Sequence, residues 1–274
     1  MLYTINIISN YKNIPKMKYP EINFDVIPKH TFSLFIGKRG SGKTNLIIEH
    51  TKNICKKRPI EKIFIIDPSE KYQKNYQNLG INNFFVYYSF DLTTWITITE
   101  EIDKLNKEYI LIMDNITIHP YLKDTYRDIV FNFKNMCLTV LFGQQFLESQ
   151  ISKPEYINNY DLIFLGQEYN TTNLKRYNDM FFPFITNFDK FKKDFNKNTT
   201  NFNFLVYHKA THTFFSHNAK YLLIIDNNIF IAVDYSDLMD VVDWLGVEDD
   251  YDDIIFPKIK ESDITYSTRI CIEV

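Results

Sequence analysis

The chain has 274 residues, of which 45% are hydrophobic and 24% are charged, and its formal net charge is -3. This apolar content supports a folded core and excludes a chain that is disordered throughout. The small net charge excludes a surface that attracts nucleic acid over its whole area, so contact with DNA would require a local basic patch or a pore. The three cysteines are odd in number and far apart, which favours free thiols in a reducing compartment.

Short apolar runs bounded by polar turns predict the strands of a sheet. These runs span residues 32–36, 62–67, 84–88, 109–114, 138–143 and 160–166. They are continuous rather than alternating, which is typical of strands buried on both faces of a mainly parallel sheet. Helix-length sequence lies between most of them, so the sequence predicts an α/β sandwich in which helices flank a mainly parallel central sheet.

Apolar spacing indicates helices over residues 45–57 and 171–181. A third amphipathic segment carries Phe188, Phe191 and Phe195 at helical spacing, with lysines between them. This pattern favours a helix that buries the phenylalanines over a segment that stacks against DNA bases.

The last part of the chain predicts further strands, a hairpin and a helix. A strand over 203–207 precedes a hairpin that joins 221–225 to 229–233, and we expect these strands to continue the sheet. An amphipathic helix is expected over 236–245, followed by an acidic loop over 248–253.

The length suits one domain. We expect a single domain over residues 1–274, with a core over about 28–235 and a C-terminal acidic extension of helix and loop over 236–274. The first ten residues do not resemble a signal peptide, and the most apolar late segment is interrupted by polar residues, so no membrane contact is expected.

Eight residues from Gly37 to Thr44 match the pattern G-x-x-x-x-G-K-[ST] between an expected strand and an expected helix, the context that the motif requires. Glycines let backbone N–H groups approach phosphate oxygens, and the start of the helix adds partial positive charge. The motif predicts a P-loop for ATP or GTP, with Lys43 on the β and γ phosphates and the Thr44 hydroxyl on Mg²⁺. The expected nucleotide-binding residues are Gly37, Lys38, Arg39, Gly40, Ser41, Gly42, Lys43, Thr44 and Asn45.

Asp114 ends the apolar run Tyr109-Ile110-Leu111-Ile112-Met113. Parallel sheets bind ligands at the carboxyl ends of their strands, where this carboxylate would lie opposite Thr44. An aspartate after an apolar strand is often only a turn residue, but its pairing with a P-loop favours a second ligand of Mg²⁺, held directly or through water.

Gln144 and Gln145 follow the expected strand over 138–143. A glutamine at this edge can orient the water that attacks a γ-phosphate, although it is a poor base. A simple turn at the end of a strand is the alternative interpretation.

Five elements follow one another along the chain. They are the P-loop, Ile63-Phe64-Ile65-Ile66-Asp67-Pro68, the strand that ends at Asp114, Leu141-Phe142-Gly143-Gln144-Gln145, and Tyr160-Asp161-Leu162-Ile163-Phe164. In order and spacing they resemble the genome-packaging ATPases of large cytoplasmic DNA viruses, the poxvirus-type branch of the FtsK/HerA superfamily. The resemblance covers about residues 28–235. It implies an ATP-driven, ring-forming motor that moves double-stranded DNA into a preformed capsid.

The residue after Asp114 departs from this family, which usually has a second acidic residue there as general base. Here the position holds Asn115, which accepts no proton at neutral pH. Glu70, after the expected strand over 62–67, and Asp67, at the end of that strand, are the alternative bases.

A second departure concerns the arginine that the family commonly presents to a neighbouring subunit. The corresponding helix here carries Lys134, which lacks the planar fork of arginine. Arg127 and Arg176 are the alternative trans-acting cations. The catalytic candidates are Lys43, Asp114, Gln144, Gln145, Glu70, Arg127 and Arg176.

The resemblance implies an ATPase with ATP and Mg²⁺ as cofactors and a homo-oligomeric ring, with double-stranded DNA and viral capsid proteins as partners. It further implies a location in the host cytoplasm, at the site of virus assembly, and in the virion. Two alternatives remain: a nucleoside or nucleotide kinase, and a nucleotide-gated assembly protein with little turnover.

Overall fold

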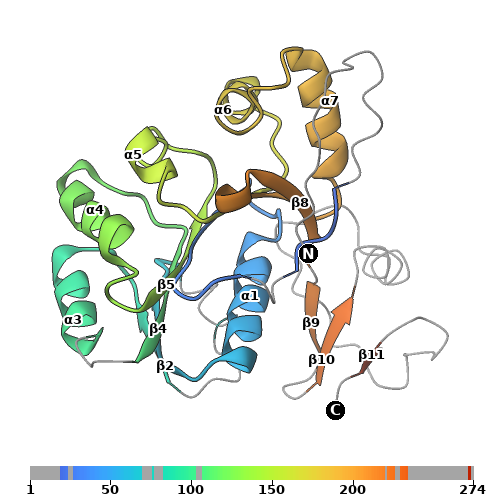
Figure 1. Cartoon of the computed structure of the whole chain (residues 1–274). Helices are drawn as coiled ribbons and strands as arrows, with labels where there is room; N and C mark the ends of the chain where they lie inside the picture. Colours follow the sequence, from blue (N-terminus) through green and yellow to red (C-terminus); the bar gives the residue numbers. More distant parts are fainter. Residues whose placement is uncertain are drawn as a thin grey trace.

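The structure is a computed structural model, and it describes residues 19–23, 27–69, 76, 83–102, 107–219, 221–225, 229–233 and 271–272. Its centre is an eight-stranded sheet with the order β3-β2-β4-β5-β1-β6-β7-β8 (Figure 1). The strands are β1 (Phe32–Ile36), β2 (Ile60–Ile66), β3 (Phe84–Tyr87), β4 (Glu108–Asp114), β5 (Leu138–Gln144), β6 (Leu162–Leu165), β7 (Asn203–His208) and β8 (Thr213–Asn218). The pairs from β3 to β6 are parallel, whereas β7 and β8 are antiparallel to their neighbours.

Helices cover both faces of this sheet (Figure 1). Their bounds are α1 (Lys43–Lys57), α3 (Leu92–Ile102), α4 (Lys123–Asn132), α5 (Pro154–Ile157), α6 (Thr171–Phe181) and α7 (Phe188–Asn198), with short 3-10 turns η2 (Pro120–Leu122) and η3 (Lys209–Thr211). Leu46 and Ile47 of α1 pack in one core with Phe35, whereas α3 to α7 contribute to a second core on the other face. Among the helices that the structure describes, none is both long and apolar enough to span a bilayer.

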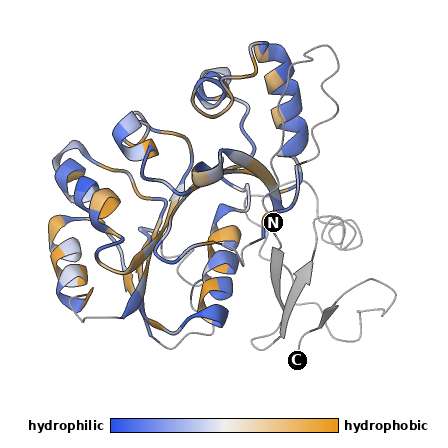
Figure 2. Cartoon of the chain, viewed as in Figure 1, coloured by the Kyte–Doolittle hydropathy of each residue, from blue (hydrophilic) through white to orange (hydrophobic). Residues whose placement is uncertain are grey.

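The strands form because their apolar runs can be buried on both faces. All five residues of β1 are buried, and successive residues serve opposite cores: Leu34 and Ile36 join one, and Phe35 joins the other. Figure 2 shows that the helices carry both hydrophobic and hydrophilic residues, and the buried ones among the hydrophobic residues belong to the two cores. The predicted parallel α/β sheet with flanking helices is therefore confirmed. The predicted amphipathic helix at Phe188 is α7, which buries Phe191 and Phe195.

The later strands differ from the prediction in two ways. The strand β8 was not predicted, because its sequence TFFSHN has no continuous apolar run and it is only half-buried. The hairpin of β9 (Tyr221–Ile225) and β10 (Ile229–Val233) is present, but it pairs with β11 (Cys271–Ile272) in a separate sheet instead of continuing the central one. The expected helix over 236–245 and acidic loop over 248–253 lie outside the described residues.

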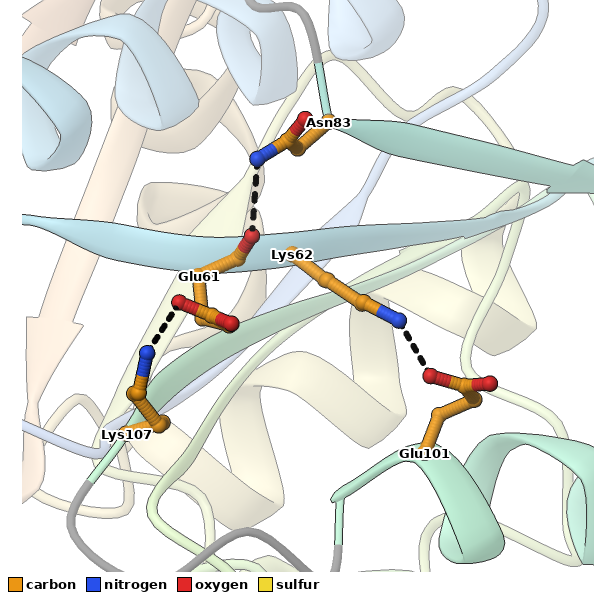
Figure 3. A network of polar contacts seen from close by, with 5 residues as sticks. All are labelled: Glu61, Lys62, Asn83, Glu101 and Lys107. Atoms are coloured by element: carbon orange, nitrogen blue, oxygen red, sulfur yellow. Dashed lines mark hydrogen bonds and ion pairs between the residues drawn. The ribbon is translucent and has the colours of Figure 1, made fainter.

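A group of polar contacts ties the amino ends of β2 and β4 to their surroundings (Figure 3). Lys107 Nζ lies 2.7 Å from Glu61 Oε2, Lys62 pairs with Glu101 at the end of α3, and Asn83 Nδ2 donates to the Glu61 carbonyl at 3.4 Å. Surface ion pairs of this kind are worth about 1 kcal/mol or less each. Their lysines lie at the opposite end of the sheet from the carboxyl ends of the strands, where the P-loop is.

Candidate functional site

The P-loop joins β1 to α1 at the carboxyl edge of the sheet. Its start is fixed to the neighbouring strand, because the Gly37 N–H donates to the Gln144 carbonyl at 3.1 Å. Gly40 and Gly42 have φ angles of 76° and 84°, a left-handed backbone that favours glycine. The loop therefore turns back tightly before the helix starts, and Lys38, Arg39 and Gly40 are left exposed at its tip.

The helix α1 begins at Lys43, two residues earlier than the sequence pattern indicated, because Gly42 is its left-handed N-cap. The cap makes no side-chain hydrogen bond, and the first turn contains no acidic residue. The first N–H groups of a helix have no partners within the helix, and the helix dipole places partial positive charge there. An uncapped helix start that follows a glycine-rich loop suits an anion such as a phosphate group.

Lys43 is buried although it carries an ammonium group, with 6% of its surface exposed. Burial lowers the pKa of Lys43, and the charge of Asp114 partly offsets this effect. Among the described residues its Nζ makes one hydrogen bond, to the Lys38 carbonyl at 3.5 Å, the long limit for such a bond. A buried cation is stabilised by a charged partner, so this amine is suited to hold an anion against the loop.

Asp114 lies at the end of β4 and is fully buried. Its Oδ2 accepts hydrogen bonds from Thr44 Oγ1 at 2.7 Å and from Tyr76 Oη at 3.0 Å. Its Oδ1 is buried and has no hydrogen-bond partner among the described residues. The predicted pairing of Thr44 with Asp114 across the sheet edge is therefore present in the structure.

Tyr76 was not identified from the sequence. It is fully buried, and burial, followed by the charges of Asp114 and Asp67, raises its pKa well above the ordinary value. The hydroxyl therefore stays protonated and acts as a donor to Asp114. A single tyrosine outside any periodic run gives no signal in the sequence, because its role depends on where the chain places it in space.

Asp67 follows β2 directly and is also fully buried. Since Ile66 pairs with Met113, the register places Asp67 beside Asp114. Burial raises the pKa of Asp67 to about 6; the Ser69 N–H, which donates to its Oδ1 at 2.9 Å, opposes the rise, and the charge of Asp114 adds to it. The structure thus brings together one of the two predicted bases and Asp114, whereas Glu70 lies outside the described residues.

The two glutamines after β5 have different environments. Gln144 is buried, and its Nε2 donates to the Ile116 carbonyl at 2.6 Å, which fixes the loop that follows Asp114. Gln145 is exposed. Gln144 is the last residue of β5, whereas Gln145 lies in the bend beyond it, so only Gln144 lies within the packed edge between the P-loop strand and the Asp114 strand.

Neither candidate trans-acting arginine forms a hydrogen bond or ion pair with the P-loop in the described part of the chain. Arg127 is exposed on α4 with its guanidinium 5.7 Å from the Phe131 ring centre. Arg176 is exposed on α6, and its Nη1 donates to the Leu147 carbonyl at 3.2 Å. Asp161 accepts a hydrogen bond from the Phe32 N–H, at the amino end of β1. Lys134 Nζ lies 3.2 Å from Asp161 Oδ1, so Lys134 is at the opposite end of the strands from the P-loop.

Comparison of the sequence with protein-family models and with curated proteins gives no match. The fold is similar to that of solved structures. The DNA-packaging ATPase B204 from Sulfolobus turreted icosahedral virus has a TM-score of 0.54 at 16% identity, covering 70% of this chain and 98% of that chain. The genome packaging NTPase B204 from Sulfolobus turreted icosahedral virus 2, in complex with ATP-γS, has a TM-score of 0.51 at 17% identity, covering 69% and 96%. The chain has the fold of a P-loop NTPase.

Proposed function

We propose that the chain is an ATPase motor that moves double-stranded DNA into a viral capsid. The observation that carries the proposal is the strand order β4-β5-β1, which places Gln144 between the P-loop strand and the strand that ends at Asp114. In the family that the sequence resembles, this glutamine sets the superfamily apart from kinases and GTPases. The two viral proteins with a similar fold are a DNA-packaging ATPase and a genome packaging NTPase, which supports the same assignment.

Magnesium fits the residues at the edge of the sheet, because this ion prefers oxygen ligands. The buried Asp114 Oδ1 lacks a hydrogen-bond partner among the described residues, and the Thr44 hydroxyl lies against the other carboxylate oxygen. We assign the ion to Thr44 and Asp114. When bound, Mg²⁺ would supply charge neutralisation on the phosphates.

Hydrolysis would depend mainly on positioning and charge stabilisation by this chain's residues. Lys43 and the N–H groups of the P-loop would hold the β and γ phosphates of ATP. Gln144 uses its Nε2 on the Ile116 carbonyl, which leaves its amide oxygen as the acceptor that orients the attacking water. The exposed Gln145 is the second candidate for this role.

Asp67 is the general base that we favour. Asn115 cannot accept a proton at neutral pH, and Asp67 is the carboxylate that the strand register places beside Asp114. Its pKa of about 6 is close to the value at which a base is both deprotonated at neutral pH and still basic enough to take a proton. Glu70 is the alternative from the sequence.

The proposed motor acts as a homo-oligomeric ring with viral capsid proteins as partners, in the host cytoplasm and the virion. In such a ring an exposed cation of one subunit would complete the site of the next. Arg176 and Arg127 are the candidates. Arg176 is favoured, because its bond to Leu147 holds its guanidinium against the loop that follows the Gln144 strand.

Steady-state phosphate release from ATP, with and without long double-stranded DNA, tests this function. The wild type should release phosphate faster with DNA, and Lys43→Ala should abolish the release. ATP consumption that ignores DNA, increases with a nucleoside or nucleotide acceptor, and yields ADP and the phosphorylated acceptor instead of free phosphate would replace the motor with a kinase. Tight ATP binding with no release would instead favour a nucleotide-gated assembly protein, for which Asn115 is the specific indication.

A further inference from the structure

The loop that follows β6, residues 166–170, lies directly against the P-loop. The Gly166 N–H donates to the Ile36 carbonyl at 2.7 Å, and a Cβ atom on Gly37 would lie only 3.5 Å from Gly166 Cα. Because β6 is the neighbour of β1 on the side away from β5, this loop borders the P-loop on the side opposite Asp114.

Tyr169 of this loop presents an aromatic ring beside the P-loop. The side chain is 58% exposed, although tyrosine usually covers much of its ring, and Lys38 Nζ lies 4.4 Å from the ring centre. The ammonium over one face shows that the ring lies against the phosphate-binding loop, and the exposed fraction shows that the rest of the ring is open.

A buried carboxylate fixes the backbone that carries this ring. Glu168 is 8% exposed; its Oε1 accepts the N–H groups of Tyr169 and Asn170, each at 2.8 Å, and its Oε2 accepts Asn173 Nδ2 at 2.7 Å. Asn170 in turn caps α6 through the N–H groups of Thr172 and Asn173. The ring is exposed, but its position is set by the first turn of a helix, as a preorganised binding surface requires.

The direction of a bound nucleotide follows from the order of the strands. The β and γ phosphates of the nucleotide would lie at Lys43 and Thr44, with the γ-phosphate toward Asp114. The nucleoside then extends to the other side of the P-loop. That side is the one bordered by the 166–170 loop. We propose that the Tyr169 ring is the stacking platform for the nucleobase, and that it favours purine over pyrimidine nucleoside triphosphates because a larger π surface stacks more strongly. The proposal rests on the nucleotide binding proposed above.

Equilibrium binding of ATP, CTP and inorganic tripolyphosphate to the wild type, Tyr169→Ala and Tyr169→Phe tests this assignment. Loss of a stacked base costs about 5- to 100-fold in affinity. Tyr169→Ala should therefore weaken ATP by about that factor, reduce the preference of ATP over CTP, and leave tripolyphosphate unchanged, while Tyr169→Phe should bind ATP like the wild type.

Tyr88→Ala is the matched control, because Tyr88 is 60% exposed and follows β3, at the far edge of the sheet from β6. It should bind all three ligands like the wild type. Equal loss of ATP and tripolyphosphate in Tyr169→Ala would show damage to the P-loop and overturn the proposal, as would unchanged ATP affinity. A wild type that binds neither ATP nor tripolyphosphate would overturn the proposed function and this proposal with it.

Discussion

Replacement of Gly143 by alanine tests the packing that holds Asp114. The register pairs Gly143 with Asp114, and an added Cβ would overlap Asp114 Oδ1 while lying 3.1 Å from Asp114 Cγ and 3.0 Å from Ile47 Cδ1. Ordinary carbon contacts are about 3.5–4.0 Å, so the carboxylate must retreat by about 0.5–1 Å. It cannot rotate away freely, because its Oδ2 is bonded to Thr44 and Tyr76.

Two effects follow from this displacement. Overpacking of a core costs about 1–3 kcal/mol of unfolding free energy. A catalytic group misplaced by about 1 Å costs about 10²-fold in turnover. We expect Gly143→Ala to lower kcat for ATP hydrolysis by about that factor, with a much smaller change in ATP affinity, because the P-loop itself is not displaced.

Turnover and chemical denaturation should be measured on the same preparations. Val140→Ile adds a methylene to the same strand on the face away from α1, so it matches the overpacking without contacting Asp114. This control should lose stability but keep kcat within about threefold, well short of the effect of a displaced catalytic group. Wild-type turnover in Gly143→Ala, or an equal loss in Val140→Ile, would refute the packing argument.

Three further predictions concern buried polar groups. Burial, reinforced by nearby positive charge, lowers the pKa of His50 to about 3. Below about pH 6.5 the unfolded chain therefore binds a proton that the folded chain does not. Between pH 8 and pH 5 the wild type should lose about 2 kcal/mol more stability than His50→Leu, and equal losses would contradict this. Asp67 should change stability with pH in the opposite direction, because its folded pKa of about 6 is above the unfolded value of 3.8. Its unfavourable contribution to stability grows as pH rises from 4 to 6. Asp67→Asn should therefore be more stable than the wild type at pH 8 and no more stable at pH 3, as urea titrations at both values can check. Tyr76→Phe removes a buried donor to a carboxylate and should cost about 1.5–3 kcal/mol in the same titrations, whereas an unchanged midpoint would mean that the bond to Asp114 contributes nothing.

The sequence was sufficient for the parallel core because its strands are continuous apolar runs that only burial on both faces explains. The P-loop and Asp114 could be predicted for a related reason: a phosphate loop needs glycines and a lysine at fixed spacing, and a parallel sheet brings the ends of its strands to one edge. The half-buried β8 could not be predicted, since antiparallel strands at the edge of a sheet need no apolar run.

Other parts of the candidate site depend on tertiary placement that local patterns do not encode. Tyr76 reaches Asp114 from 38 positions away along the chain, so no spacing rule identifies it. Tyr169 is a single aromatic residue whose position is set by Glu168, and only the neighbouring P-loop gives it a role. The different environments of Gln144 and Gln145 follow from where β5 ends, and the apolar run alone does not fix that boundary to one residue.

Titration of the chain with ATP in the presence of Mg²⁺, for the wild type and Lys43→Met, tests the central claim most directly. Loss of one charge-assisted contact to phosphate is worth about 1.5–3 kcal/mol, or about 10- to 100-fold in affinity. Lys62→Met is the control, because Lys62 pairs with Glu101 at the other end of the sheet (Figure 3). The account predicts that the wild type and Lys62→Met bind ATP alike and that Lys43→Met binds it at least about tenfold more weakly. Equal affinity in all three proteins would contradict the assignment of the phosphate site to this loop.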